Sequence, residues 1–559
     1  MGYLIWLLSI SMVTVSAQKV QKTDGQSIEL EALKSKISRL VPLEIKAPTH
    51  QLSKKDQQAL QKIILAAKLM DPIYDRQVWA GNGELRKKII DDKTEVGIKR
   101  LKLFDQNRGP WSRIDSNKVF IALAPKGKPI GAGYYPEDMT KGEFEIWLKT
   151  LSPSVQTKAT GFFSVIKRDD NRGLKLIPYS EEYAEFLKPA AELLNEAQEL
   201  TENATLKKFL KLRAEAFLSD DYYASDVAWM DLDSPIEVTI GPYETYEDEL
   251  FGYKAAFEAF VTITDVNESQ KLAKFSSYLQ ELENNLPLDN RFKNKKIAAL
   301  APIRVVDEVY ASGEARRGVT TAAFNLPNDE KVVKEKGSKR VMLKNIQQAK
   351  FDRVLTEISK KVLTPKNQTE VKFEPFFTHI LMHELMHGIG PHNIIVGTRE
   401  SNVRMELKDH YSAVEEAKAD ITGLFALQYL IDKGVIDKKM ENSMYLTFLA
   451  SAFRSVRFGI TEAHGRGVAL QFNFLQDEGA IIQDRQGKFS IDVTKIKPAV
   501  KKLTRELLTL QAEGDYERAR TLLAKYATVR PAMQKALDSL KDVPVDIDPI
   551  FQTEEMGKI

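Results

Sequence analysis

Two short segments rich in histidine and carboxylate residues constrain the fold most, because their side chains can meet only if two helices pack together. The first segment, 383–387, reads HELMH, and the second, 415–420, reads EEAKAD. Residues four apart on a helix project from one face, so His383 and His387 can reach a single metal ion. Glu416 can supply a carboxylate to the same ion. We therefore expect a helix pair that carries a metal site.

The flanking residues predict where the two helices begin and end. Pro375 suits a position in the first turn, and Gly388 is a typical stop signal directly after the second histidine. Ser412 and Glu415 match a capping box, which predicts the start of the second helix. Apolar residues then recur at helical spacing up to Leu427.

Two histidines and one glutamate complete the protein share of a catalytic zinc site and leave one position open. We predict that His383, His387 and Glu416 hold one Zn²⁺ per chain. Glu384 lies beside the open position and suits the role of general base. An HExxH match alone also occurs in ordinary amphipathic helices. The carboxylates downstream favour the metal interpretation.

Three further side chains suit a supporting part in such a site. Asp420 shares a helix face with Glu416, which is typical of a carboxylate that orients a ligating histidine. Glu415 suits the same part, although a helix cap alone explains it. His379 lies one turn before His383, and we interpret it as a packing or supporting residue.

Composition excludes several classes of function. The chain has 559 residues, 43% of them hydrophobic and 28% charged, and a net charge of +3, as expected for a soluble globular protein with at least two cores. The sequence has no basic stripe interleaved with aromatic residues and no phosphate-binding Gly-rich loop, so nucleic acid is not an expected partner. Because there is no cysteine, any metal must bind to nitrogen and oxygen.

The N-terminus predicts export. Residues 3–15 form an apolar run, and Ala17 ends a stretch typical of a signal-peptide cleavage site, although no Lys or Arg precedes the run. The run is short for a membrane span, which needs about 20 apolar residues. We therefore expect a signal peptide over residues 1–17, a periplasmic or secreted protein, and no stable membrane anchor.

The remaining patterns predict an α+β protein. Residues 180–218 read as a long helical stretch with Asn203 as a possible interruption, and strand-like runs cluster between residues 236 and 326. From residue 351 onward the chain is mostly helical in pattern. A mixed α/β portion followed by a helical catalytic portion is the simplest interpretation.

Between about residues 232 and 479 the sequence resembles the dipeptidyl peptidase III family. Four groups of segments carry the resemblance in the family's order: Glu244-Thr245-Tyr246 with Leu250-Phe251-Gly252; Asn325-Leu326-Pro327-Asn328 with 337–339 and 343–345; 415–420; and Ala463-His464 with Leu475 and Gly479. The family usually has one more residue between the zinc histidines. The helical spacing here should still bind zinc.

The resemblance implies a fold of two lobes with a cleft between them. One is a mixed α/β lobe with a small β-barrel-like sheet, which we place at residues 18–264 and 309–354. The other is a mainly helical, zinc-binding catalytic lobe at residues 265–308 and 355–559. The resemblance also implies a monomer.

Site residues also follow from the resemblance. Tyr246 and His464 are implied to stabilise the oxyanion of the tetrahedral intermediate, and Glu244, Asn325 and Asn328 to bind the substrate. Without the resemblance, the two asparagines could be turn residues beside a proline and Glu244 a solvated charge. An arginine expected after the catalytic histidine aligns with Val468, and the role of Arg466 stays open.

These observations predict a zinc-dependent peptidase that releases dipeptides from oligopeptides. A first alternative is a zinc endopeptidase or single-residue aminopeptidase with the same metal centre. A second alternative is a peptide-binding protein that has lost catalysis, against which the intact Glu384 argues.

Overall fold

The computed structural model describes residues 27–297, 302–461 and 463–553. The predicted signal peptide lies outside these residues. Among the described residues, no helix is both long and apolar enough to cross a membrane. The described chain divides into two compact units: unit 1 within residues 27–264, 306–343 and 546–553, and unit 2 within residues 265–305 and 344–545.

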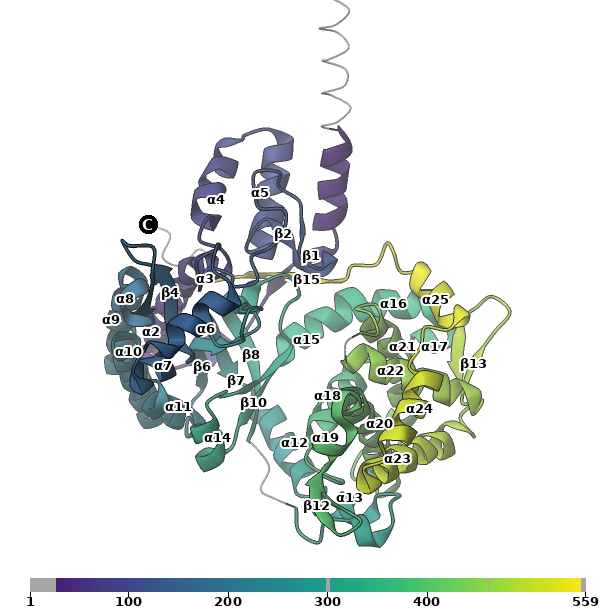
Figure 1. Ribbon diagram of the computed structural model, residues 1–559. Coiled ribbons are helices and arrows are strands. Elements are labelled where there is room, and N and C mark those ends of the chain that lie inside the picture. The colour runs from purple at the N-terminus through teal and green to yellow at the C-terminus, as the bar shows by residue number, and fades with distance from the viewer. Residues whose placement is uncertain (1–26, 298–301, 462, 554–559) are drawn as a thin grey trace, which may run out of the picture. The chain divides into compact units, whose positions relative to one another are not determined.

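A five-stranded sheet forms the centre of unit 1 (Figure 1). Its order is β6-β7-β8-β10-β9, with bounds Ile236–Glu244 (β6), Ala256–Thr264 (β7), Ile303–Gly313 (β8), Lys339–Leu343 (β10) and Ala323–Leu326 (β9). β-Branched and aromatic residues fill the strands and are buried on them, as strand propensity favours. The fold class α+β is thus confirmed.

The expected β-barrel-like sheet is wrong, because the strand order is open. β6 and β9 form the two edges and are not paired with each other in the described sheet. The loop after β9 reaches the end of β6 through a side chain: the Asn328 amide nitrogen donates to the Tyr243 carbonyl over 2.9 Å. One side-chain bond does not close a backbone ladder.

Helices cover this sheet, and α2 and α3 pack against β7. The predicted interruption at Asn203 is confirmed: α9 ends at Leu200, and the Asn203 side chain caps α10 at the Leu206 amide. Residues 27–37 of unit 1 are helical. The labelled helices of unit 1 are α2 (Lys54–Lys68), α3 (Met70–Val78), α4 (Asn82–Asp91), α5 (Glu95–Asn107), α6 (Lys141–Lys149), α7 (Pro153–Ala159), α8 (Tyr179–Glu182), α9 (Ala184–Leu200), α10 (Ala204–Ser219), α11 (Tyr223–Met230) and α14 (Glu330–Lys336).

Short two-stranded sheets complete unit 1. Two are antiparallel pairs, β2 (Trp111–Ser112) with β3 (Lys118–Val119), and β4 (Ser164–Arg168) with β5 (Leu174–Pro178). In the third, β1 (Leu40–Ile45) pairs in parallel with β15 (Asp546–Phe551). The grouping therefore differs from the expected domain boundaries at the C-terminus, because β15 belongs to unit 1.

Unit 2 is mostly helical, with α20 packed against α18, α22 and α23 (Figure 1). Its helices are α12 (Val266–Ser276), α13 (Leu279–Asn285), α15 (Lys344–Lys350), α16 (Thr356–Val362), α17 (Pro365–Gln368), α18 (Phe373–Met386), α19 (Val403–Leu407), α20 (Tyr411–Asp432), α21 (Met440–Val456), α22 (Ala463–Asp477), α23 (Ile496–Glu513), α24 (Tyr516–Tyr526) and α25 (Pro531–Asp538). Two hairpins, β11 (Asn393–Val396) with β12 (Arg399–Asn402) and β13 (Ile481–Gln483) with β14 (Phe489–Ile491), lie between them in sequence.

Candidate metal centre

The last turns of α18 and the first turns of α20 bring the two predicted motifs together. His383 lies in the last turn of α18, and His387 caps the helix. Gly390 follows with a φ of +82°, a conformation that glycine adopts readily. The Glu283 carboxylate accepts the Gly390 amide over 2.7 Å, and this bond fixes the chain just after the helix.

Three side chains offer ligand atoms around one point. The Nε2 atoms of His383 and His387 lie 3.1 Å apart. Oε2 of Glu416 lies 3.2 Å from the first of these atoms and 3.8 Å from the second. The three ligand atoms fall within 4.8 Å of one another. The structure thus assembles the predicted triad.

The donor set fits a metal ion. Two imidazole nitrogens bound tetrahedrally to one zinc ion lie about 3.3 Å apart, given Zn–N bonds of ~2.0–2.1 Å, and the observed separation is close to this. Among the described residues, Oε2 of Glu416 is buried and accepts no hydrogen bond, so it lacks the partner that a cation would supply. Two nitrogens and one oxygen are typical of zinc and of other first-row transition metals.

The other nitrogen of each histidine is held by a carboxylate of α20. Nδ1 of His383 lies 2.8 Å from Asp420, and Nδ1 of His387 lies 2.8 Å from Glu415. These bonds fix the ring orientations and direct both Nε2 atoms toward the same point. The expected capping box is wrong: α20 begins at Tyr411 without a side-chain cap, and Glu415 contacts the histidine instead.

Sequence reasoning missed the buried amides and the lysine that support these carboxylates. Lys418 is fully buried, and its ammonium lies 2.9 Å from Glu415 and donates to the Met386 and Ile389 carbonyls at the end of α18. Gln511 donates to Glu415 over 2.8 Å. The available signal was the lysine's spacing, three residues after Glu415 on the buried side of the helix.

On the opposite side of the centre, Asp420 receives a bond of 3.2 Å from the Gln471 amide on α22. His379 is buried, and its Nε2 lies 3.0 Å from the Asp420 carbonyl, as suits a packing and supporting residue. Its ring also meets Phe448 edge-on. Asp420 is thereby fixed through both its carboxylate and its backbone.

Electrostatics keep the carboxylates of the centre ionised. Burial raises the pKa of Glu415, but Lys418 and His387 together lower that pKa well below its ordinary value. Burial likewise opposes ionisation of Asp420, and His383 reverses the effect and lowers its pKa. The ligating histidines are therefore paired with negative charge, which raises their basicity as ligands.

Two predicted catalytic residues belong to this region. Glu384 lies on α18 beside the first ligand and is half-buried. His464 is the second residue of α22; its side chain is 68% exposed, and its Nε2 lies 3.2 Å from Oε2 of Glu416. Arg466 lies two residues further along α22 and is half-buried.

The predicted substrate residues lie in unit 1, at the end of β6 and beside β9. Asn328 donates to the Tyr243 carbonyl and lies 3.4 Å from the Glu244 carboxylate, so two of these residues meet. Asn325 is exposed on β9, and Tyr246 is 69% exposed in the loop after β6. Burial raises the pKa of Glu244.

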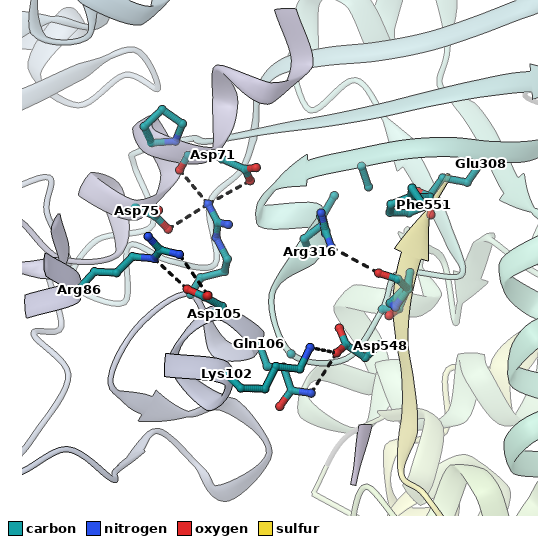
Figure 2. Close-up of a pocket in the computed structure, with 17 residues that line it drawn as sticks. Asp71, Asp75, Arg86, Lys102, Asp105, Gln106, Glu308, Arg316, Asp548 and Phe551 are labelled. Carbon is teal, nitrogen blue, oxygen red and sulfur yellow. Dashed lines mark hydrogen bonds and ion pairs between the residues drawn. The ribbon is translucent and has the colours of Figure 1, made fainter. Parts of the chain in front are cut away.

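A separate polar cavity of about 390 Å³ also lies in unit 1 and contains no predicted site residue (Figure 2). Its walls are largely neutralised by their own ion pairs. Arg108 contacts Asp71 and Asp75 at 3.0 and 2.9 Å, and Lys102 contacts Asp548 at 2.5 Å. Because the charged side chains that line the cavity are paired with side chains of opposite charge, the cavity does not favour a ligand of either charge.

The chain is similar to a known protein family and to proteins of known structure. The family model described as peptidase family M49 matches residues 139–418. The solved structure of DPP III from Caldithrix abyssi is 47% identical with a TM-score of 0.90, covering 94% of this chain and all of that one. Dipeptidyl-peptidase III from Corallococcus sp. strain EGB is 53% identical with a TM-score of 0.78, covering 94% and 97%.

The matches to curated relatives cover a smaller share of the relative's own length. Nudix hydrolase 3 of Arabidopsis thaliana is 45% identical, and the match covers 95% of this chain and 75% of the plant protein. Human dipeptidyl peptidase 3 is 24% identical, and the match covers 76% of this chain and 63% of the human protein. A quarter or more of each relative thus lies outside the match.

Proposed function

The chain belongs to peptidase family M49, the dipeptidyl peptidase III family of metallopeptidases, and we propose that it removes dipeptides from the N-termini of oligopeptides with zinc as its cofactor. The observation that carries this proposal is the convergence of His383, His387 and Glu416, each histidine being oriented by its own carboxylate. The identities with two dipeptidyl peptidase III structures support the choice of substrate.

Zinc at this site would supply Lewis acidity, which polarises a carbonyl group and brings the pKa of water toward ~7. Glu384 has the chemistry of a general base that accepts the proton of the attacking water and passes it to the leaving amine. Tyr246 and His464 carry O–H and N–H groups that can donate to the developing oxyanion, a contribution of about 3–4 kcal/mol per donor.

Release of dipeptides requires recognition of a free α-ammonium at a fixed distance from the scissile bond. A carboxylate and amide oxygens are the groups that suit an ammonium. Glu244 and Asn328, which meet at the end of β6, and Asn325 on β9 supply these groups. We assign substrate binding to them.

One assay tests the substrate class. Matched oligopeptides with free and N-acetylated termini are digested by the purified protein, the products are identified by mass spectrometry, and zinc is measured in the same preparation. The proposal expects dipeptides from the free peptide and little cleavage of the acetylated one. Equal cleavage of both would favour an endopeptidase, and single residues as products would favour an ordinary aminopeptidase.

Export is part of the proposal and rests on the N-terminal sequence alone. N-terminal sequencing of protein recovered from the producing cells should find a chain that starts near Gln18. A chain that starts at Met1 would contradict it.

A further inference from the structure

Helix α22 packs against helix α20 along one face of each (Figure 1). His464, Gly467 and Gln471 follow one another at spacings of three and four residues, so they lie on the same face of α22. The Nε2 atom of His464 lies 3.2 Å from Oε2 of Glu416, and the Gln471 amide donates to Asp420 over 3.2 Å. This face of α22 therefore joins the predicted oxyanion donor to the helix that carries a candidate metal ligand.

The position of His464 depends mainly on the backbone of its helix. Its side chain is 68% exposed, so the protein packs around only a small part of it. The ring faces that of His383, with the two centroids 6.2 Å apart. The distance from His464 to Glu416 is therefore set by where the α22 backbone lies relative to α20.

Gly467 allows the backbones of α22 and α20 to touch. A Cβ atom at this position would lie 3.0 Å from the amide nitrogen of Ala417 and 3.1 Å from the carbonyl oxygen of Ala413. Both atoms belong to the α20 backbone, so they cannot turn aside as a flexible side chain would. A side chain at position 467 would therefore push the first turns of α22, with His464, away from α20.

The first turn of α22 is confined from a second side. A Cβ atom at Gly465 would overlap the carbonyl oxygen of Gly459, in the turn after α21. The helix start therefore lies between two backbone surfaces. Because both surfaces are close, a small displacement on one side changes the position of His464.

Gln471 fixes α22 along the direction of its axis. Its side chain is fully buried, and Nε2 donates to Oδ2 of Asp420. The other oxygen of this carboxylate lies 2.8 Å from Nδ1 of His383. One carboxylate thus orients a candidate metal ligand and holds the helix of the oxyanion donor. A slide of α22 by one residue, about 1.5 Å, would break this bond.

We propose that Gly467 and Gln471 are positioning residues for the reaction, which together fix His464 relative to the candidate metal ligands. This inference rests on the proposed function, in which His464 donates to the oxyanion. Both residues are buried and act through the α22 backbone. A donor must lie about 2.7–3.1 Å from the oxyanion, so a displacement of a fraction of an ångström weakens its effect.

A double-mutant cycle with His464 tests this role. Gly467→Ala displaces α22, and Gln471→Met removes the amide donor while it keeps the length of the side chain. Each change is made in the parent protein and in His464→Ala, and kcat is measured with the metal content of the same preparation. Each should lower kcat about tenfold in the parent protein and have no further effect once His464 is absent.

A binding measurement tests the same dependence without turnover. The probe is a phosphinic peptide analogue, whose tetrahedral phosphinyl group resembles the oxyanion in shape and charge. Calorimetry should show binding about tenfold weaker in Gly467→Ala and in Gln471→Met. The variants that lack His464 should all bind the analogue equally, whereas a role confined to helix packing would not depend on His464.

Two matched controls separate positioning from other effects. Gln511→Met removes the corresponding amide from Glu415 on the side of α23. It should weaken metal binding as Gln471→Met does, but its effect on kcat should be the same with and without His464. At Gly142 on α6, a Cβ atom would meet open space among the described residues, so Gly142→Ala should leave kcat unchanged.

The outcomes are read for each residue separately. A variant whose loss is equal with and without His464, or whose kcat is unchanged, removes its residue from the proposal. Removal of both overturns this inference and leaves the proposed function intact. If Gly467→Ala does not fold, Gln471→Met decides alone. A parent protein that releases no dipeptides from oligopeptides overturns the proposed function itself.

Discussion

The buried carboxylates of two regions differ in the partners that they have. One region is the metal centre, and the other, the sheet end, is the part of the five-stranded sheet where Glu244 on β6 and Glu258 on β7 lie. At the metal centre, Glu415 and Asp420 each contact a histidine and a buried amide, and Lys418 adds a cation. At the sheet end, Glu244 and Glu258 have no cation in the described structure. The two supporting carboxylates of the first region complete their bonds within the protein, and the two carboxylates of the second region do not.

Under the proposed function, the two regions bind different partners. A metal needs ligands fixed to within fractions of an ångström, which a network of buried hydrogen bonds provides. Under the proposed function, a peptide terminus arrives and leaves at each turnover, so a site that binds it should stay unpaired between cycles.

The largest effect should follow loss of a metal ligand. Glu416→Ala removes the only carboxylate of the triad, so metal affinity should fall by more than the ~10–100-fold typical of supporting residues, and activity should fall with it. Metal content after dialysis against a chelator measures this. Glu400→Ala, at an exposed position of the same unit, is the control. Full metal content in Glu416→Ala would assign the third ligand elsewhere.

The next largest effect should follow loss of a predicted hydrogen-bond donor to the oxyanion, of which one belongs to each unit. Tyr246→Phe and His464→Ala should each lower kcat by about 10²–10³-fold while the metal stays bound, because each removes one hydrogen-bond donor for the oxyanion. Single-turnover kinetics with metal analysis check this. If both donors serve one oxyanion, the double variant should lose less than the product of the single losses. A normal kcat in either variant would remove that residue from catalysis.

Removing the buried lysine beside the metal centre should lower the metal affinity less than removing a ligand does. Lys418→Met leaves Glu415 with fewer partners, so metal affinity should fall by about 10–100-fold and the unfolding free energy of the metal-free protein by about 3–5 kcal/mol. Chelator competition and urea unfolding measure the two. Lys439→Met, at an exposed position of the same unit, should change neither.

The smallest effect concerns pH at the sheet end. Burial raises the pKa of Glu314 to about 7, above its ordinary value of 4.5. The folded state therefore holds a proton that the unfolded state has lost, and this stabilisation is complete below pH ~4.5 and disappears as pH rises through about 7. Over that interval the unfolding free energy should fall by up to about 3 kcal/mol.

Glu314→Gln should flatten this part of the stability curve, as followed by urea unfolding between pH 4.5 and 8. The carboxylates of the metal centre have lowered pKa values, so they do not contribute a decline in this direction. An identical slope in the variant would mean that Glu314 is ionised throughout.

The sequence predicted the two histidines of the candidate metal site because helical spacing is a local property. His383 and His387 are four residues apart on one helix, and Asn203 caps a helix by the same short-range rules. Glu415 was ambiguous, since a cap and a contact with His387 use the same carboxylate, and only the packing of α18 on α20 decides between them.

Features that depend on tertiary packing were not predicted from the sequence. Lys418 lies in a polar hexapeptide that suggests a solvated face, yet it is fully buried against the end of another helix. The sheet was expected to close, whereas the link from β9 to β6 is a single asparagine side chain. The positions of Glu244 and Asn328 side by side, 84 residues apart in sequence, follow from that link.

The parallel pairing of β1 with β15 makes residues 546–551 part of unit 1. A chain truncated just before Asp546 would retain the candidate ligands His383, His387 and Glu416 and still leave the backbone of β1 without its strand partner. Such an edge is a template for association with other chains. We expect the truncated product to be lost to aggregation and proteolysis, although it retains the whole candidate metal site.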